Sequence, residues 1–176
     1  RCILFVSRVL MLGDCDNLAE KGYLGSQDDQ IMVTQAVGEI PKRHELQQAW
    51  NEDIRMKFWF TSQGSRIMPY AWFTWLEQVD NQNLFRDAQH MEALRYLPMP
   101  SSKVNPAGLP IGFALDRDAT DDSTWVGLTC AACHTNQLDY QGTKILIEGA
   151  PTLANFVLFY DRLVAALNNT YQQDDK

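Results

Sequence analysis

Hydrophobic residues recur at helical spacing in several stretches of the chain, and these stretches predict most of its regular structure. We expect helices over residues 44–61, 69–80 and 83–95, a short helix over 125–135, and a long helix over 152–169. The longest apolar stripe belongs to the last of these helices; it comprises Leu153, Phe156, Val157, Tyr160, Leu163, Val164 and Leu167. Residues 144–148 predict one brief strand.

Prolines and glycines interrupt the pattern between Tyr96 and Asp122. Proline removes a backbone donor and clashes with the preceding helical turn, so this stretch cannot be one regular helix, and we expect a long ordered loop. The pattern as a whole predicts a mainly α fold with long irregular loops. It also divides the chain into an N-terminal approach segment, residues 1–43, and one domain, residues 44–176.

The first twelve residues are largely apolar with interspersed basic residues. They read either as the tail of an export signal, with Cys15 as a lipid-attachment site, or as a helix or strand that opens a mature domain. Asp14 stands where a lipid-attachment motif requires a small residue. No run of about 18 apolar residues predicts a complete transmembrane helix.

The sequence Cys130-Ala-Ala-Cys133-His134 is the pattern that attaches a haem covalently. One helical turn brings the two sulfurs to the same side, where they can form thioethers with the two vinyl groups of a haem. The adjacent imidazole of His134 then ligates the iron. The sequence therefore predicts a c-type haem domain with one covalent haem c, and Thr129 as the helix cap.

Two other interpretations of the cysteine pair are weaker. A thioredoxin-like redox pair follows a strand in a βαβ unit, and the pattern shows no such unit. A structural zinc site needs four ligands, and no second pair of Cys or His is spaced to complete one.

The sixth iron position separates electron transfer from catalysis, because Met or His closes it in the first case and it stays open in the second. No Met or His follows His134 in the sequence. The ligand therefore comes from upstream or from another polypeptide region, or the position is open. The upstream candidates are His90, Met99, Met91 and Met68, with His90 and Met99 foremost. Taken alone, His90 fits a solvated helix surface, Met99 fits a packing role and His44 fits an exposed position.

The formal net charge is -7 and the pI is near 4.8. An acidic chain argues against nucleic-acid binding, which requires clustered Lys and Arg. It favours a basic redox partner attracted by electrostatic steering.

Several segments together resemble the N-terminal haem domain of dihaem cytochrome c peroxidase-like proteins, in particular the rubber-oxygenase-like branch. The segments are Gly127–Thr135, Tyr140, Gly142-Thr143, Ile147–Thr152 and Phe156, with Gln63–Ser65, Pro69–Phe73, Leu76–Gln78, Asn105–Pro110 and Gly112-Phe113 upstream. The resemblance spans about residues 50–165.

The resemblance implies a periplasmic or otherwise exported, mainly helical protein with two c-type haem domains. One haem serves peroxide or dioxygen chemistry and the other supplies electrons. Of the family's site residues, Cys130, Cys133 and His134 carry over. The chain departs from the family in holding one haem motif where the family has two. It is therefore a fragment, whose second haem domain lies elsewhere, or a shortened relative.

Three functions remain open on these observations. The first is an electron-transfer cytochrome with one haem. The second is a peroxidase- or oxygenase-type domain of a longer dihaem protein with an open sixth position. The third is an accessory subunit of a larger complex, in which the proline-rich loop is the docking surface.

Overall fold

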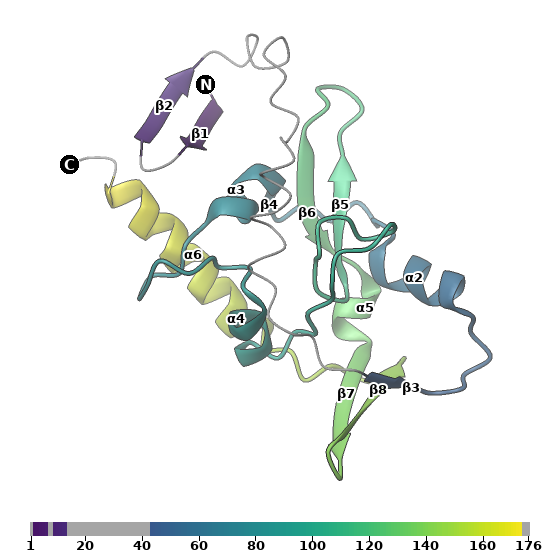
Figure 1. The fold of residues 1–176 in the computed structure, drawn as a ribbon. Coiled ribbons are helices and arrows are strands. Elements are labelled where there is room, and N and C mark those ends of the chain that lie inside the picture. The colour runs from purple at the N-terminus through teal and green to yellow at the C-terminus, as the bar shows by residue number, and fades with distance from the viewer. Residues whose placement is uncertain (1, 7–8, 14–42, 174–176) are drawn as a thin grey trace.

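The computed structural model of the protein describes residues 2–6, 9–13 and 43–173 (Figure 1). Across these ranges it has five helices and eight strands. The strands are β1 (Cys2–Val6), β2 (Val9–Gly13), β3 (Arg43–Glu45), β4 (Met68–Pro69), β5 (Phe113–Arg117), β6 (Thr124–Leu128), β7 (Thr135–Tyr140) and β8 (Thr143–Glu148). The helices are α2 (Glu52–Phe60), α3 (Tyr70–Trp75), α4 (Ala88–Ala93), α5 (Cys130–Cys133) and α6 (Phe156–Gln173).

The prediction of a mainly α fold was wrong, because strands account for much of the described chain. Two three-stranded sheets are present, in the orders β3-β8-β7 and β4-β6-β5, and β1 pairs with β2 in a separate antiparallel ribbon. The domain that carries the cysteine motif is therefore a mixed α and β structure. Two hairpins that flank α5 account for most of the difference, and each begins or ends beside the motif.

The hairpin β7–β8 extends away from the body of the molecule (Figure 1). Its strands pair from Thr135 with Glu148 to Tyr140 with Thr143. Gln141 and Gly142 join them, both with positive φ, which matches the right-handed twist of the strands in a two-residue turn. The strand predicted over residues 144–148 is confirmed as β8, and the parallel pairing of Arg43 with Lys144 adds β3 to the same sheet.

The hairpin β5–β6 begins in the stretch that the prolines marked as irregular. Its second strand, β6, includes residues 125–128, so the helix predicted over residues 125–135 was wrong there and is limited to α5. The irregular course is confirmed as far as Gly112, but residues 113–117 form β5 and pair with β6. A loop held by Asp118 and Asp121 connects the strands: each carboxylate accepts from the backbone N–H two residues later. The strands were not predicted because neither β5 nor β6 alternates strictly between apolar and polar residues.

The predicted helices exist but are mostly shorter, and side-chain caps explain where several of them begin. Asn51 accepts from the N–H of Ile54, so α2 starts at Glu52 and not at residue 44. Asp87 caps α4 in the same way. Asn155 accepts from the N–H of Leu158, which moves the start of the last helix from residue 152 to Phe156.

Two buried clusters hold these elements together. The larger is built around an aromatic group consisting of Phe73, Phe85, Tyr96, Phe113 and Phe159. The smaller joins α2, the proline-rich loop, α5 and β8 through Trp59, Ile111, Ala131 and Leu146. Since Ala132 belongs to the larger cluster and Ala131 to the smaller, α5 sits where the two clusters meet.

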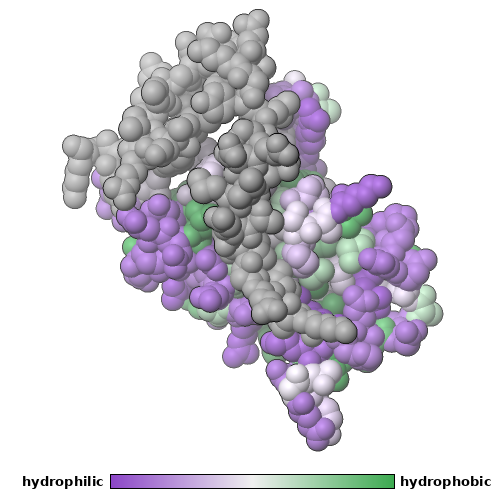
Figure 2. All heavy atoms as spheres, viewed as in Figure 1, coloured by the Kyte–Doolittle hydropathy of each residue, from purple (hydrophilic) through white to green (hydrophobic). Residues whose placement is uncertain are grey.

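None of the helices in the described ranges has the length and apolar character needed to span a bilayer. The predicted approach segment falls mainly outside the described residues, apart from β1, β2 and Arg43. The space-filling view shows mixed hydrophilic and hydrophobic residues over the body, while the projecting hairpin at its lower end is purple to white (Figure 2).

Candidate haem-attachment site

The cysteine motif forms one turn of helix, as its spacing predicts. The hydroxyl of Thr129 accepts from the N–H of Ala131 at 3.2 Å, which confirms the predicted cap. The N–H of His134 donates to the carbonyl of Cys130 at 2.9 Å and closes the turn. The helix therefore begins and ends with the motif itself.

The two faces of α5 differ sharply in exposure. Cys130, Cys133 and His134 are exposed, and both thiols are free. Ala131 and Ala132 are buried at 1% and 4% exposure. The reactive groups thus lie on the outward side, and the small side chains between them allow the helix to pack closely on the core.

Gly112 makes that close packing possible. A Cβ atom at this position would overlap the backbone of Ala132, and its φ of +86° lies in the region that favours glycine. The carbonyl of Gly112 also accepts from the N–H of Thr129 at 2.8 Å. The role of Gly112 could not be predicted from its neighbours, because the only local signal is Pro110 two residues earlier.

A second contact holds the start of α5. The side-chain oxygen of Gln63 lies 3.1 Å from both the N–H and the sulfur of Cys130, and accepts from them. The segment around Gln63 runs against β6, where a Cβ on Gly127 would overlap the carbonyl of Ser65. The loop after α2 is thereby fixed beside the first cysteine.

Tyr96 lies near the second cysteine and is 4% exposed. Burial raises the pKa of Tyr96 to about 12, and the charge of Cys133 adds to the effect. Its ring packs edge-on against Phe113 and Phe159, with centroids 5.0 and 5.3 Å away. The surroundings of Cys133 on the inward side are therefore apolar and aromatic.

The chain that follows β8 satisfies the carbonyls at the end of α5. Gly149 donates its N–H to the carbonyl of His134 at 2.7 Å, and Thr152 donates to that of Cys133 at 2.9 Å. Just before this segment, Glu148 is buried and its Oε1 accepts from Nε of Arg55 at 2.5 Å. The backbone of the motif is thus anchored on both sides.

Of the sixth-ligand candidates, His90 is buried at 8% exposure, so the solvated position considered for it was wrong. Its Nδ1 lies 2.6 Å from the carbonyl of Phe85. A carbonyl only accepts, so Nδ1 carries a proton in this contact. His44 is exposed, as expected.

Met99 packs against the smaller cluster, and its sulfur accepts from Nη1 of Arg43 at 3.5 Å. It also lines a cavity of about 580 Å³ between α2 and the proline-rich loop, together with Met56, Phe60 and Asn105. In the described part of the chain, the side-chain hydrogen bonds of Met99 and His90 go to Arg43 and Phe85 and not to His134, and no three His, Cys, Asp or Glu side chains gather as a metal site. The identity of the sixth iron ligand therefore stays a prediction.

The described residues nevertheless suit a covalently attached haem. Two free thiols one turn apart, an accessible imidazole after the second, and small residues between them are the groups that thioether attachment and iron ligation need. Cys130 and Cys133 would hold the porphyrin, and His134 would bind its iron.

Comparison with known proteins gives one informative similarity. The uncharacterized protein y4iJ of Sinorhizobium fredii (strain NBRC 101917 / NGR234) is 32% identical, and the match covers 65% of this chain and 22% of that protein. The chain thus spans about a fifth of the length of this relative. No protein-family model and no solved structure matches the chain.

Proposed function

We propose that the chain is a c-type cytochrome domain that carries one covalent haem and transfers electrons. The observation that carries the proposal is the arrangement of α5, in which Cys130, Cys133 and His134 are exposed while Ala131 and Ala132 are buried. A haem bound there exchanges one electron at a time, and its potential depends on burial and on the sixth ligand. The resemblance of residues 50–165 to dihaem cytochromes supports the same proposal.

Different residues of the chain have different roles at the proposed site. The two thiols would hold the ring, and the imidazole of His134 would bind the iron. Thr129, Gln63 and Gly112 hold α5 so that these three groups share one face.

Haem staining of a denaturing gel tests the attachment. The wild-type protein, matured in a host with a c-type haem-attachment system, retains haem after denaturation. The double variant Cys130→Ala/Cys133→Ala loses it, and Cys2→Ala serves as a matched control that keeps it. Retention in the double variant, or a colourless wild-type protein, would refute thioether attachment.

A second candidate is a peroxidase- or oxygenase-type domain of a longer dihaem protein. The observation in its favour is the greater length of the Sinorhizobium relative, which leaves room for further domains. Absorption spectra separate the candidates. A low-spin spectrum that cyanide and carbon monoxide leave unchanged supports electron transfer, whereas a high-spin spectrum that responds to them supports an open iron site.

The proposal includes an exported location and a redox partner. Thioether attachment in bacteria takes place outside the cytoplasm, as the family resemblance implies, so the mature holoprotein belongs in the periplasm or beyond it. Fractionation of cells that express the full-length natural protein tests this, and haem-stained protein confined to the cytoplasm would contradict it.

A further inference from the structure

Arg55 and Glu148 form an ion pair that is buried behind the cysteine motif. The two residues are 5% and 4% exposed, and Nε of Arg55 lies 2.5 Å from Oε1 of Glu148. Arg55 also contacts Glu45, whose side chain is 43% exposed, at 2.8 Å. One arginine therefore holds a buried carboxylate and an exposed one.

Glu148 lies across the hairpin from the residue that follows the predicted iron ligand. Thr135 and Glu148 are directly paired in the antiparallel ladder, and Gly149 donates to the carbonyl of His134. Directly opposed residues point to the same face of a sheet, with Cα atoms about 4.5–5.5 Å apart. The side chain of Glu148 thus lies on the same face of the sheet as that of Thr135, the residue after His134.

The second oxygen of this carboxylate has an unusual environment. Among the described residues, Oε2 of Glu148 and Oγ1 of Thr135 are both fully buried without a hydrogen-bond partner in the protein. A charged oxygen in a region of low dielectric, with no donor directed at it, acts on its surroundings more strongly than a solvated one.

We propose that Glu148 positions His134 and sets the charge at the haem site. Through Arg55, Glu148 fastens β8, which pairs with the strand that follows His134, to helix α2. Its negative charge stabilises ferric over ferrous haem and so lowers the reduction potential. This inference rests on the proposed function, because it requires haem at Cys130 and Cys133.

Spectroelectrochemical titration of the holoprotein tests the inference with two matched variants. Glu148→Gln removes the buried charge at nearly constant shape and raises the midpoint potential. Glu45→Gln removes the exposed partner of the same arginine and shifts the potential much less, because solvent and salt screen it. Glu148→Asp restores the charge and brings the potential back toward the wild-type value.

Equal shifts in the two glutamine variants, no shift, or a lower potential in Glu148→Gln would overturn the inference. If Glu148→Gln does not fold, Glu148→Met replaces it and is also expected to raise the potential, since it removes the buried charge while Arg55 keeps Glu45 as a partner; a lower or unchanged potential would then refute the charge-setting role. A wild-type protein without covalent haem refutes the proposed function itself. A haem-bearing wild type with unresponsive variants refutes only the role of Glu148.

Discussion

Gly112 combines two constraints at one residue: a positive φ and contact with the backbone of α5. Gly112→Ala is expected to destabilise the protein by at least about 2 kcal/mol, because it adds backbone strain and overpacking together. It should also reduce haem attachment, since α5 is displaced. Denaturant unfolding and haem staining measure the two effects.

Gly64→Ala is the control for this change. Gly64 also has positive φ, at +80°, but no atom lies within 4 Å of the position that its Cβ would take. The free energy of unfolding of this variant should fall by only about 1 kcal/mol, because backbone strain alone is added. Equal losses at the two glycines would contradict the contact with α5 as the cause.

Arg55 provides a second prediction at the scale of single residues. Arg55→Ala leaves the carboxylate of Glu148 buried without its partner, so the free energy of unfolding should fall by about 3–5 kcal/mol. Lys57→Ala on the same helix breaks the exposed pair with Asp53 and should cost no more than about 0.5 kcal/mol. Similar losses in both variants, measured by urea unfolding, would count against the importance of burial.

The raised pKa of Tyr96 predicts that the stability of the folded protein falls at alkaline pH. Burial raises its pKa to about 12, above the value near 10 expected for an unfolded chain. The folded protein therefore holds this proton more tightly, and the associated stability is complete below about pH 10 and declines as the pH rises toward 12. Tyr96→Phe should show a shallower decline over this range in thermal unfolding; an unchanged slope would contradict it.

The residues of the cysteine motif could be predicted because they lie close together in the sequence. Cys130, Cys133 and His134 follow one another within a single turn, so spacing alone suggests their role. Gly112 and Glu148 could not be found in the same way, since each acts through a contact with a segment distant in the sequence. Whether His90 or Met99 completes the iron site depends on such long-range contacts as well.

Among the elements, α5 depends on its cap more than a longer helix would. Thr129→Ala removes the hydroxyl that accepts from Ala131 and also donates to the carbonyl of Trp59 at 3.3 Å. We expect a loss of about 1 kcal/mol and a lower yield of haem-stained protein. Asn51→Ala at the start of α2 should cost a similar amount in unfolding experiments but leave haem attachment intact. Equal attachment in the two variants would contradict a specific role for the cap of α5.

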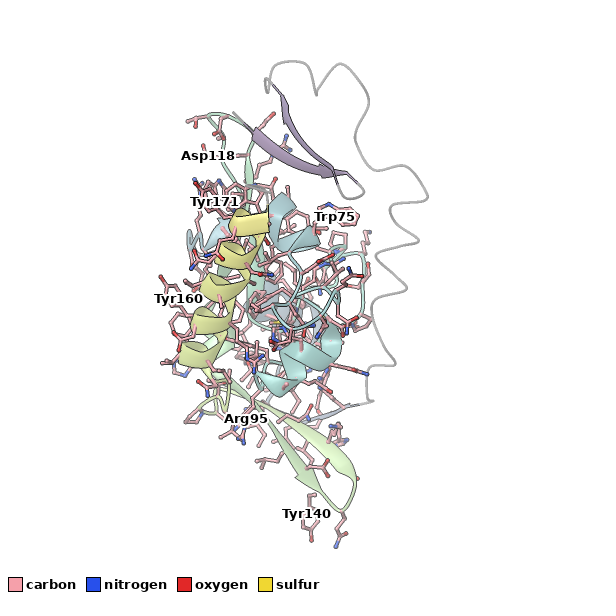
Figure 3. The ribbon with its side chains drawn as sticks, turned by 90° about the vertical axis from the view of Figure 1, so that its left-hand side faces the viewer. Trp75, Arg95, Asp118, Tyr140, Tyr160 and Tyr171 are labelled. Atoms are coloured by element: carbon pink, nitrogen blue, oxygen red, sulfur yellow. The ribbon has the colours of Figure 1, made fainter. Side chains whose placement is uncertain are left out.

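Sequence periodicity identified helices better than strands. Apolar spacing correctly predicted a helix at α6, but it assigned the wrong face to the core. The buried face holds Phe159, Leu163 and Ala166, whereas most of the predicted stripe is exposed. Phe156 and Tyr160 lie outside this buried face, and Figure 3 shows Tyr160 and Tyr171 on the outer side of α6. The helix starts could not be placed from apolar spacing alone, because Asn51 and Asn155 fix them through hydrogen bonds.

At the scale of the whole molecule, the net charge of -7 predicts how the proposed electron transfer depends on salt. Electron exchange with a cationic redox partner should slow as ionic strength rises from about 0.01 to 0.15 M, because the screening length falls from about 30 to 8 Å. Stopped-flow kinetics measure this rate. A neutral small-molecule reductant should show little change, and a rate that rises with salt for the cationic partner would exclude steering by the acidic surface.

The fold class could not be derived from local pattern because the two hairpins around α5 depend on pairing between short segments. β5 has five residues, and β7 follows the motif without an intervening loop. The helical content was visible in the sequence, while the sheets that connect the helices were not. This is why a prediction correct for several elements was wrong for the molecule.

The hairpin β7–β8 has its two ends beside His134 and Glu148 and its tip far from both, with Tyr140 exposed at the end of the arm (Figure 3). A Cβ added at Gly142 in the turn would meet no atom within 4 Å, so the turn borders open space. Exposed tips of this kind tolerate added sequence. An affinity tag or a fluorescent label inserted in this turn would allow the protein to be purified and tracked. The insertion would be remote from the cysteines and would leave both termini unmodified.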